Sequence, residues 1–166
     1  MALKDSLLPE FDHEMGVTRK LLDRLPDADL GWKPHEKSFS LGDLAAHLAQ
    51  ILHWSAAILD QPSYDLESGG DDDRKTPTKG ADVVTAFDRS VAAARAKLAG
   101  KSDAELMGAW TLKKGGQDMF TMPAIAAFKG FIINHSIHHR GQLSVYLRLR
   151  NVPLPAIYGP SADEPM

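Results

Sequence analysis

The segment from residue 128 to residue 149, FKGFIINHSIHHRGQLSVYLRL, decides the fold that the sequence predicts. Its apolar and histidine positions recur at alternating steps of four and three, the spacing of a core-facing stripe on a helix packed in a bundle. The members of this stripe are Phe128, Ile132, His135, His139, Gln142, Tyr146 and Leu149. We therefore predict a helix from about residue 121 to residue 150. Pro123 is tolerated in its first turn, and Pro153 prevents its extension.

Three further segments have the period of a helix, and we predict that they cover residues 3–25, 40–60 and 81–98. Ser40 with Asp43 resembles a capping box at the start of the second helix. Residues 61–79 are predicted to form a polar loop whose acidic run, Asp71-Asp72-Asp73, is solvated because it lacks the spacing of a calcium-binding loop. Residues 110–121 contain the signals of a small hairpin. The expected fold class is thus all-α, a four-helix bundle in a single domain over residues 1–166, with a small hairpin between the third and fourth helices.

The composition is that of a globular protein long enough to have a core of its own, with 166 residues, 43% of them hydrophobic and 25% charged. The formal net charge of −3 gives no basic footprint for nucleic acid or an anionic membrane. The chain has no cysteine, which excludes disulfides, thiolate catalysis and cysteine-ligated zinc. Because the first residues lack the apolar core of a signal peptide and no apolar run reaches membrane-spanning length, we expect a cytoplasmic protein.

Three histidines are the candidate metal ligands. His135 and His139 stand four apart, so a helix places both imidazoles on one face within reach of one metal ion. A third ligand is expected from a facing helix, and His47 qualifies because it is three residues after Leu44 and four before Ile51. Three imidazoles without cysteine favour one divalent ion, Zn²⁺, Ni²⁺, Fe²⁺ or Mn²⁺. The alternative is structural, since an inward histidine is more often a hydrogen-bonded core residue.

Neighbouring polar residues receive secondary assignments. Gln142 is predicted to be a buried amide that orients a histidine ligand or binds substrate. Glu14 is considered as a fourth ligand or a base, and His138 as a reserve ligand at the edge of the helix. Arg140 is predicted to point away from the histidine face into a surface ion pair, with binding of a substrate carboxylate as the alternative.

The motifs around these histidines resemble those of the DinB-like family of bacterial four-helix-bundle proteins. The resemblance is carried by Ser40-Leu41-Gly42-Asp43-Leu44-Ala45-Ala46-His47-Leu48, by His135-x3-His139-Arg140-Gly141-Gln142, and by the segments 18–26 and 32–34. It implies a bundle that binds one divalent metal through His47, His135 and His139, commonly as a homodimer. It also implies kinship with metal-dependent transferases and isomerases that use low-molecular-weight thiols; the family name does not imply DNA binding.

Three functions are compatible with the sequence. In the first, the protein is a divalent-metal-dependent enzyme, a thiol-dependent S-transferase or a hydrolase acting on a small molecule, with the metal as Lewis acid and generator of a nucleophile. In the second, it is a non-enzymatic module that binds metal or a small molecule in a stress response. In the third, the inward histidines bond only to one another or to Gln142 and serve the structure alone.

Overall fold

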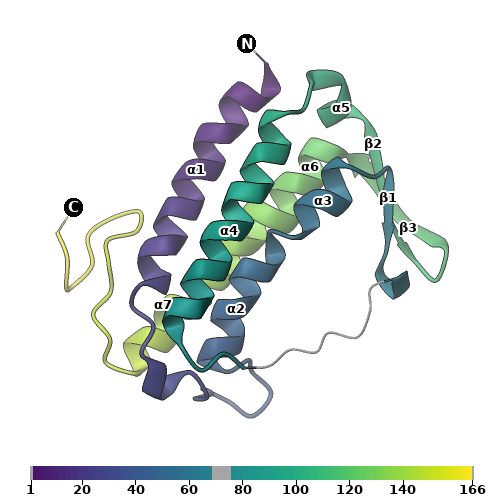
Figure 1. Cartoon of the computed structure of the whole chain (residues 1–166). Helices are drawn as coiled ribbons and strands as arrows, with labels where there is room; N and C mark the ends of the chain where they lie inside the picture. The colour runs from purple at the N-terminus through teal and green to yellow at the C-terminus, as the bar shows by residue number, and fades with distance from the viewer. Residues whose placement is uncertain (1, 69–75, 166) are drawn as a thin grey trace.

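A computed structural model describes residues 2–68 and 76–165 of the chain. Its longer helices are α1 (Leu3–Leu22), α2 (Leu41–Ile51), α4 (Gly80–Ala99) and α7 (His135–Leu149). Helix α1 packs against α4 and α7, and α2 packs against the same two helices (Figure 1). The histidine-bearing helices α2 and α7 are therefore direct neighbours.

The remaining helical segments are short. They are α3 (Trp54–Leu59), α5 (Asp103–Met107), α6 (Ala124–Phe128), two 3₁₀ turns (Asp27–Asp29 and Leu66–Ser68) and a π-helical segment η3 (Lys129–Asn134). Segments α6, η3 and α7 follow one another without a break, so one long helical rod runs over residues 124–149. π-Helical stretches inside α-helices are rare, and those that occur frequently lie at functional sites.

The predicted all-α class is wrong, because the chain contains a three-stranded mixed sheet. Its strands are β1 (Ser63–Asp65), β2 (Ala109–Lys114) and β3 (Gln117–Pro123), in the order β1-β2-β3. Strands β2 and β3 form the antiparallel hairpin expected between the third and fourth predicted helices, whereas β1 pairs with β2 in parallel. Figure 1 shows the sheet at one end of the helical layer, beside α3.

The sequence does not predict strand β1, because three residues are too few to show an alternating pattern. It lies within residues 61–79, which were predicted to be loop throughout, and its pairing partner is distant in sequence. The expected acidic run Asp71-Asp72-Asp73 lies outside the described residues.

Two predicted helices have different bounds in the structure. The second is interrupted after Ile51 by a turn at Leu52 and His53, so α2 and α3 are separate helices. The fourth begins at Ala124 instead of residue 121, because the backbone up to Pro123 pairs with β2. The start of α2 agrees with the prediction, since the Ser40 hydroxyl accepts a hydrogen bond of 3.0 Å from the Asp43 amide.

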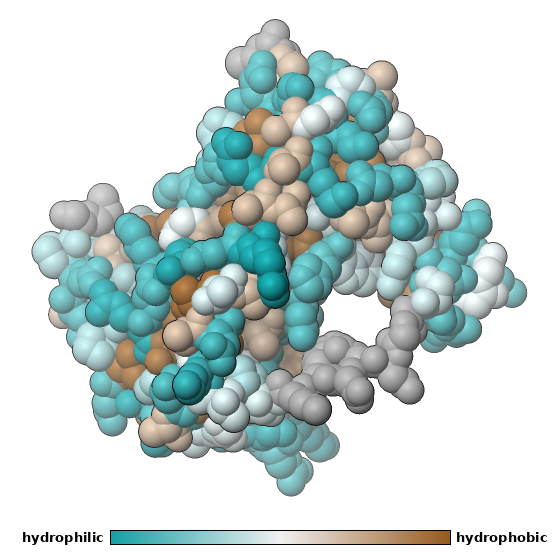
Figure 2. Space-filling model, viewed as in Figure 1, coloured by the Kyte–Doolittle hydropathy of each residue, from teal (hydrophilic) through white to brown (hydrophobic). Residues whose placement is uncertain are grey.

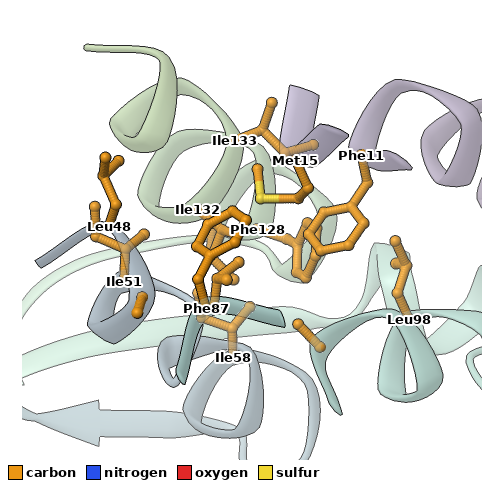
Figure 3. Close-up of a cluster of buried hydrophobic side chains, with 14 of the residues drawn as sticks. Phe11, Met15, Leu48, Ile51, Ile58, Phe87, Leu98, Phe128, Ile132 and Ile133 are labelled. Carbon is orange, nitrogen blue, oxygen red and sulfur yellow. The ribbon is translucent and has the colours of Figure 1, made fainter. Parts of the chain in front are cut away.

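The core lies between the helices and continues under the sheet. Side chains of α1 (Phe11, Met15), α2 (Leu48, Ile51) and α4 (Phe87, Leu98) meet those of α6 and η3 (Phe128, Ile132, Ile133) (Figure 3). Hydrophilic residues dominate the face seen in Figure 2, with apolar residues scattered among them. Within residues 2–68 and 76–165, no helix has the length and apolar character needed to cross a bilayer.

Candidate metal centre

Three histidines from two helices converge beside the core. One nitrogen from each of His47, His135 and His139 lies within 4.8 Å of the other two, and this is the cluster of potential metal ligands found among the described residues. The ring centroid of His47 is 5.3 Å from that of His135 and 4.7 Å from that of His139, both edge-on. All three side chains are half-buried. The structure therefore brings together the three residues singled out as ligands.

The helix α7 presents its histidines at the margin of the core. Its buried residues are Ser136, Arg140, Leu143 and Leu147. At about 100° of rotation per residue, His135 and His139 lie roughly a quarter-turn away from this stripe. They consequently face α2 and open space, and the predicted core-facing stripe is one residue out of register.

The second nitrogen of His139 is held by an oxygen acceptor. Its Nδ1 lies 2.7 Å from Gln142 Oε1, an amide oxygen that can only accept, so Nδ1 carries the proton. Nε2 of His139 is thus left with a lone pair.

The Nε2 lone pair of His139 points at His135. The Nε2 atoms of His135 and His139 are 2.8 Å apart, so Nε2–H of a neutral His135 can donate to this lone pair. Two imidazoles bound to one tetrahedral ion at 2.0–2.1 Å place their nitrogens about 3.3 Å apart, so a metal ion would replace this hydrogen bond after the two rings separate by about 0.5 Å. Three imidazole nitrogens within 4.8 Å of one another are a donor set that fits a nitrogen-ligated divalent ion.

Burial favours the neutral form of both α7 histidines. Burial, the largest cause, lowers the pKa of both His135 and His139 below the ordinary 6.5. The Gln142 hydrogen bond opposes this shift in His139, and mutual repulsion with neighbouring histidines adds to it. Neutral imidazole is the form that binds metal ions, so these residues need lose no proton to do so at neutral pH.

The histidines open onto a cavity of about 540 Å³. It is lined by His47, Gln50, Ile51, His53, Trp54, Ala57, Tyr64, Phe131 and His135. This volume is within the range of small-molecule sites. Gln50, Tyr64 and Phe131 carry no sequence signal that sets them apart from other polar or core positions.

Two neighbours of the histidines differ from the predictions in their burial. Gln142 is exposed, not buried, although it does contact His139. Arg140 is not on the surface: it is 2% exposed, and its guanidinium forms a 2.7 Å ion pair with Glu14 of α1. Tyr158, from the segment after α7, donates to Glu14 Oε2 at 2.7 Å and accepts from Arg140 at 2.6 Å.

This network removes Glu14 from the set of possible ligands, because the metal cluster contains only histidines and the Glu14 carboxylate is already engaged. His138 is exposed, as expected for a residue at the edge of the helix, and its ring contacts His139 at a centroid distance of 4.9 Å. His53 donates to or accepts from the Ser90 hydroxyl at 3.1 Å, which fixes its ring at the cavity wall.

The fold and the histidine cluster define a mainly helical protein with a small mixed sheet and a compact candidate metal centre between two helices. Comparison with known proteins gives its family: residues 1–165 match the DinB family, and the chain belongs to it. The chain is 26% identical over 161 residues to the uncharacterized protein YrdA of Bacillus subtilis, a match that covers 96% of this chain and 90% of that protein.

Two solved structures have the same fold. A DinB-like protein from Bacillus cereus superposes with a TM-score of 0.71 at 24% identity, covering 93% of this chain and 97% of the other. The DinB-like protein YjoA from Bacillus subtilis gives 0.68 at 19% identity, covering 90% and 96%.

Proposed function

We propose that this protein is a divalent-metal-dependent enzyme whose ligands are His47, His135 and His139. The observation that carries the proposal is the convergence of three imidazoles from two helices, with one nitrogen of each within 4.8 Å of the other two and His139 Nδ1 held by Gln142 on the opposite side of its ring. Ligand histidines characteristically donate their second N–H to a carbonyl or amide oxygen in this way. An ion held by neutral imidazoles lowers the pKa of a thiol or water bound to it, which makes either a nucleophile at neutral pH.

The chain's own residues have separate tasks in this proposal. Gln142 keeps the proton of His139 on Nδ1 and so directs Nε2 toward the cluster. His47 and His135 stand in the cavity wall, so a small molecule in the cavity lies against the ligand set. The Gln50 amide in the same wall can donate or accept a hydrogen bond that orients the substrate.

The reaction proposed is nucleophilic transfer to a small electrophile, either of a low-molecular-weight thiol or of water. Membership of the DinB family and the histidine cluster support a metal site. The thiol and the homodimeric state are carried forward as predictions from the family resemblance, and the cytoplasmic location stays a prediction.

The first test is elemental analysis of protein purified without a histidine tag. We expect about one divalent ion per wild-type chain, as three-histidine sites hold. The variant His135→Ala should lose it, and His138→Ala should keep it because His138 is exposed and outside the cluster. Equal metal contents in both variants, or none in the wild type after growth with added metals, contradicts the proposal.

The second test concerns catalysis. Wild-type protein is screened with several cellular thiols combined with electrophiles, and with activated esters and amides. We expect turnover that is lost on chelation, restored by the metal found in the first test, and absent in His135→Ala but present in His138→Ala. A protein that retains its metal and turns over nothing would be a binding module, and the enzymatic part of the proposal would be wrong.

A further inference from the structure

The cavity beside the histidines is lined by two chemically different sets of side chains. One set is polar and consists of His47, His53, His135 and the Gln50 amide. The other is a wall of three half-buried aromatic rings, Trp54, Tyr64 and Phe131. Each ring belongs to a different element, namely α3, β1 and η3. A molecule that fills the cavity therefore contacts both polar nitrogen and amide groups and ring faces.

The aromatic wall is rigid because its rings pack on one another. The ring centroid of Trp54 is 5.1 Å from that of Tyr64 and 5.7 Å from that of Phe131, the latter pair nearly parallel at 24°. Behind them, the buried Trp110 lies 5.9 Å from Phe131. Ring pairs at these distances attract each other beyond the area that they bury.

The sheet fixes this wall to the rest of the protein. Trp110 of β2 donates its indole N–H to the Ala57 carbonyl of α3 at 2.9 Å. Tyr64 of β1 is paired in parallel with Leu112 of the same strand β2. One strand thus positions both the α3 side and the Tyr64 side of the wall, so the ring faces are in place before any ligand arrives.

Among the described residues, the lining of the cavity has no Lys, Arg, Asp or Glu. A carboxylate, phosphate or ammonium group placed against the aromatic rings would lose water without gaining an opposite charge from these lining residues, which is unfavourable. An uncharged flat ring, in contrast, exchanges water for contact with aromatic faces.

We infer that the substrate bound here is an uncharged aromatic molecule, with its ring against Trp54, Tyr64 and Phe131 and its reactive group at the histidine cluster. The position of the reactive group rests on the proposed function. The position of the aromatic ring does not, since the ring site is formed by residues outside the ligand set. The inference assigns the aromatic group to the electrophile and places the charged parts of any thiol partner outside this cavity.

The test uses two kinds of probe and calorimetric titration. On metal-loaded protein, benzohydroxamate should bind roughly tenfold or more tightly than acetohydroxamate, because it buries an additional ring. A benzohydroxamate with a carboxylate in the para position should lose that advantage. Naphthalene-type probes without a metal-binding group should bind saturably to metal-free protein as well.

Matched variants locate the site. Trp54→Leu should reduce the preference for benzohydroxamate several-fold, up to about tenfold. Phe39→Leu should leave it unchanged, because Phe39 contacts His47 at a centroid distance of 5.6 Å but does not line the cavity. Ala57→Glu places a carboxylate in the wall and should make a para-aminomethyl probe bind more tightly than benzohydroxamate, a gain that misfolding cannot mimic.

The outcomes separate this inference from the proposed function. If the chain holds no metal but still binds the naphthalene-type probe, with loss in Trp54→Leu, the aromatic site stands and the metalloenzyme proposal falls. If metal is bound but both hydroxamates bind equally, the aromatic site is wrong and the metal proposal stands. Failure of both the metal and the naphthalene-type probe to bind overturns both.

Discussion

The buried ion pair between Arg140 and Glu14 yields the most demanding test of the structure. Their side chains are 2% and 10% exposed, and the charged atoms are 2.7 Å apart. The substitution Arg140→Met keeps a long apolar chain in α7 but leaves the Glu14 carboxylate buried without a counter-charge. Removing one partner of a buried pair typically costs about 3–5 kcal/mol of folding free energy.

The structure places the expected loss toward the lower end of that range. The Glu14 carboxylate retains the hydrogen bond from Tyr158 at 2.7 Å after Arg140 is removed. We therefore expect a loss of about 3 kcal/mol for Arg140→Met, or a fall in the melting temperature of roughly 10 °C in a chain of this size. Denaturation by urea at neutral pH, followed by far-ultraviolet circular dichroism, measures the loss.

A control on the same helix separates burial from charge. Arg148 pairs with Asp163, but its side chain is 45% exposed. The substitution Arg148→Met should cost at most about 1 kcal/mol, because water replaces the lost partner. The double variant Glu14→Leu with Arg140→Met should recover most of the lost folding free energy, since no buried charge is then left without a partner. The Tyr158 side chain, which bonds to both residues, is 63% exposed and can hydrogen-bond to water instead. If Arg140→Met is no worse than Arg148→Met, or if the double variant loses the sum of the two single effects, the assignment of a buried, mutually dependent pair is wrong.

Three further predictions concern single side chains. Gln142→Leu should weaken metal binding by about 10–100-fold in a chelator competition, the usual effect of removing such a partner, while thermal stability stays near wild type because Gln142 is exposed. Ser136→Ala should raise the free energy of unfolding by about 1 kcal/mol, because Ser136 Oγ is fully buried and has no hydrogen-bond partner among the described residues; a loss of stability in urea denaturation would contradict this. Partial burial and the hydrogen bond to Glu14 raise the pKa of Tyr158 above 10.0, so its contribution to stability is complete below that pH and lost as pH rises further. The stability difference between wild type and Tyr158→Phe should therefore shrink as the pH rises above about 10, and a difference that grows instead would refute this account.

The sequence predicted the histidine cluster better than it predicted the helix that carries two of its members. The spacing of His135 and His139 depends only on local helix geometry, and His47 follows from its place beside Leu44 and Ile51. The face of α7 that enters the core depends instead on Arg140, which looks like a surface residue from its type alone. Its burial becomes possible only because Glu14, 126 residues earlier in the chain, supplies the opposite charge.

The same dependence on distant partners explains the wrong register of the predicted stripe. Phe128 and Ile132 are buried as predicted, and a continuation at steps of three and four then favours either His135 or Ser136. The π-helical turns over Lys129–Asn134 fall at this point. The apolar pattern could not decide between the two continuations, because the chosen one contains a serine and an arginine.

The sheet, which the predicted all-α class leaves out, contributes directly to the cavity beside the histidines. Strand β1 contributes Tyr64 to the cavity, and β2 holds α3 in place through the bond from Trp110 to Ala57. In this protein helical segments supply the histidines and two of the aromatic rings of the cavity, and the sheet adds Tyr64. The metal ligands that we propose therefore come from the part of the chain whose spacing is most local, and Tyr64 comes from the part whose pairing is least local.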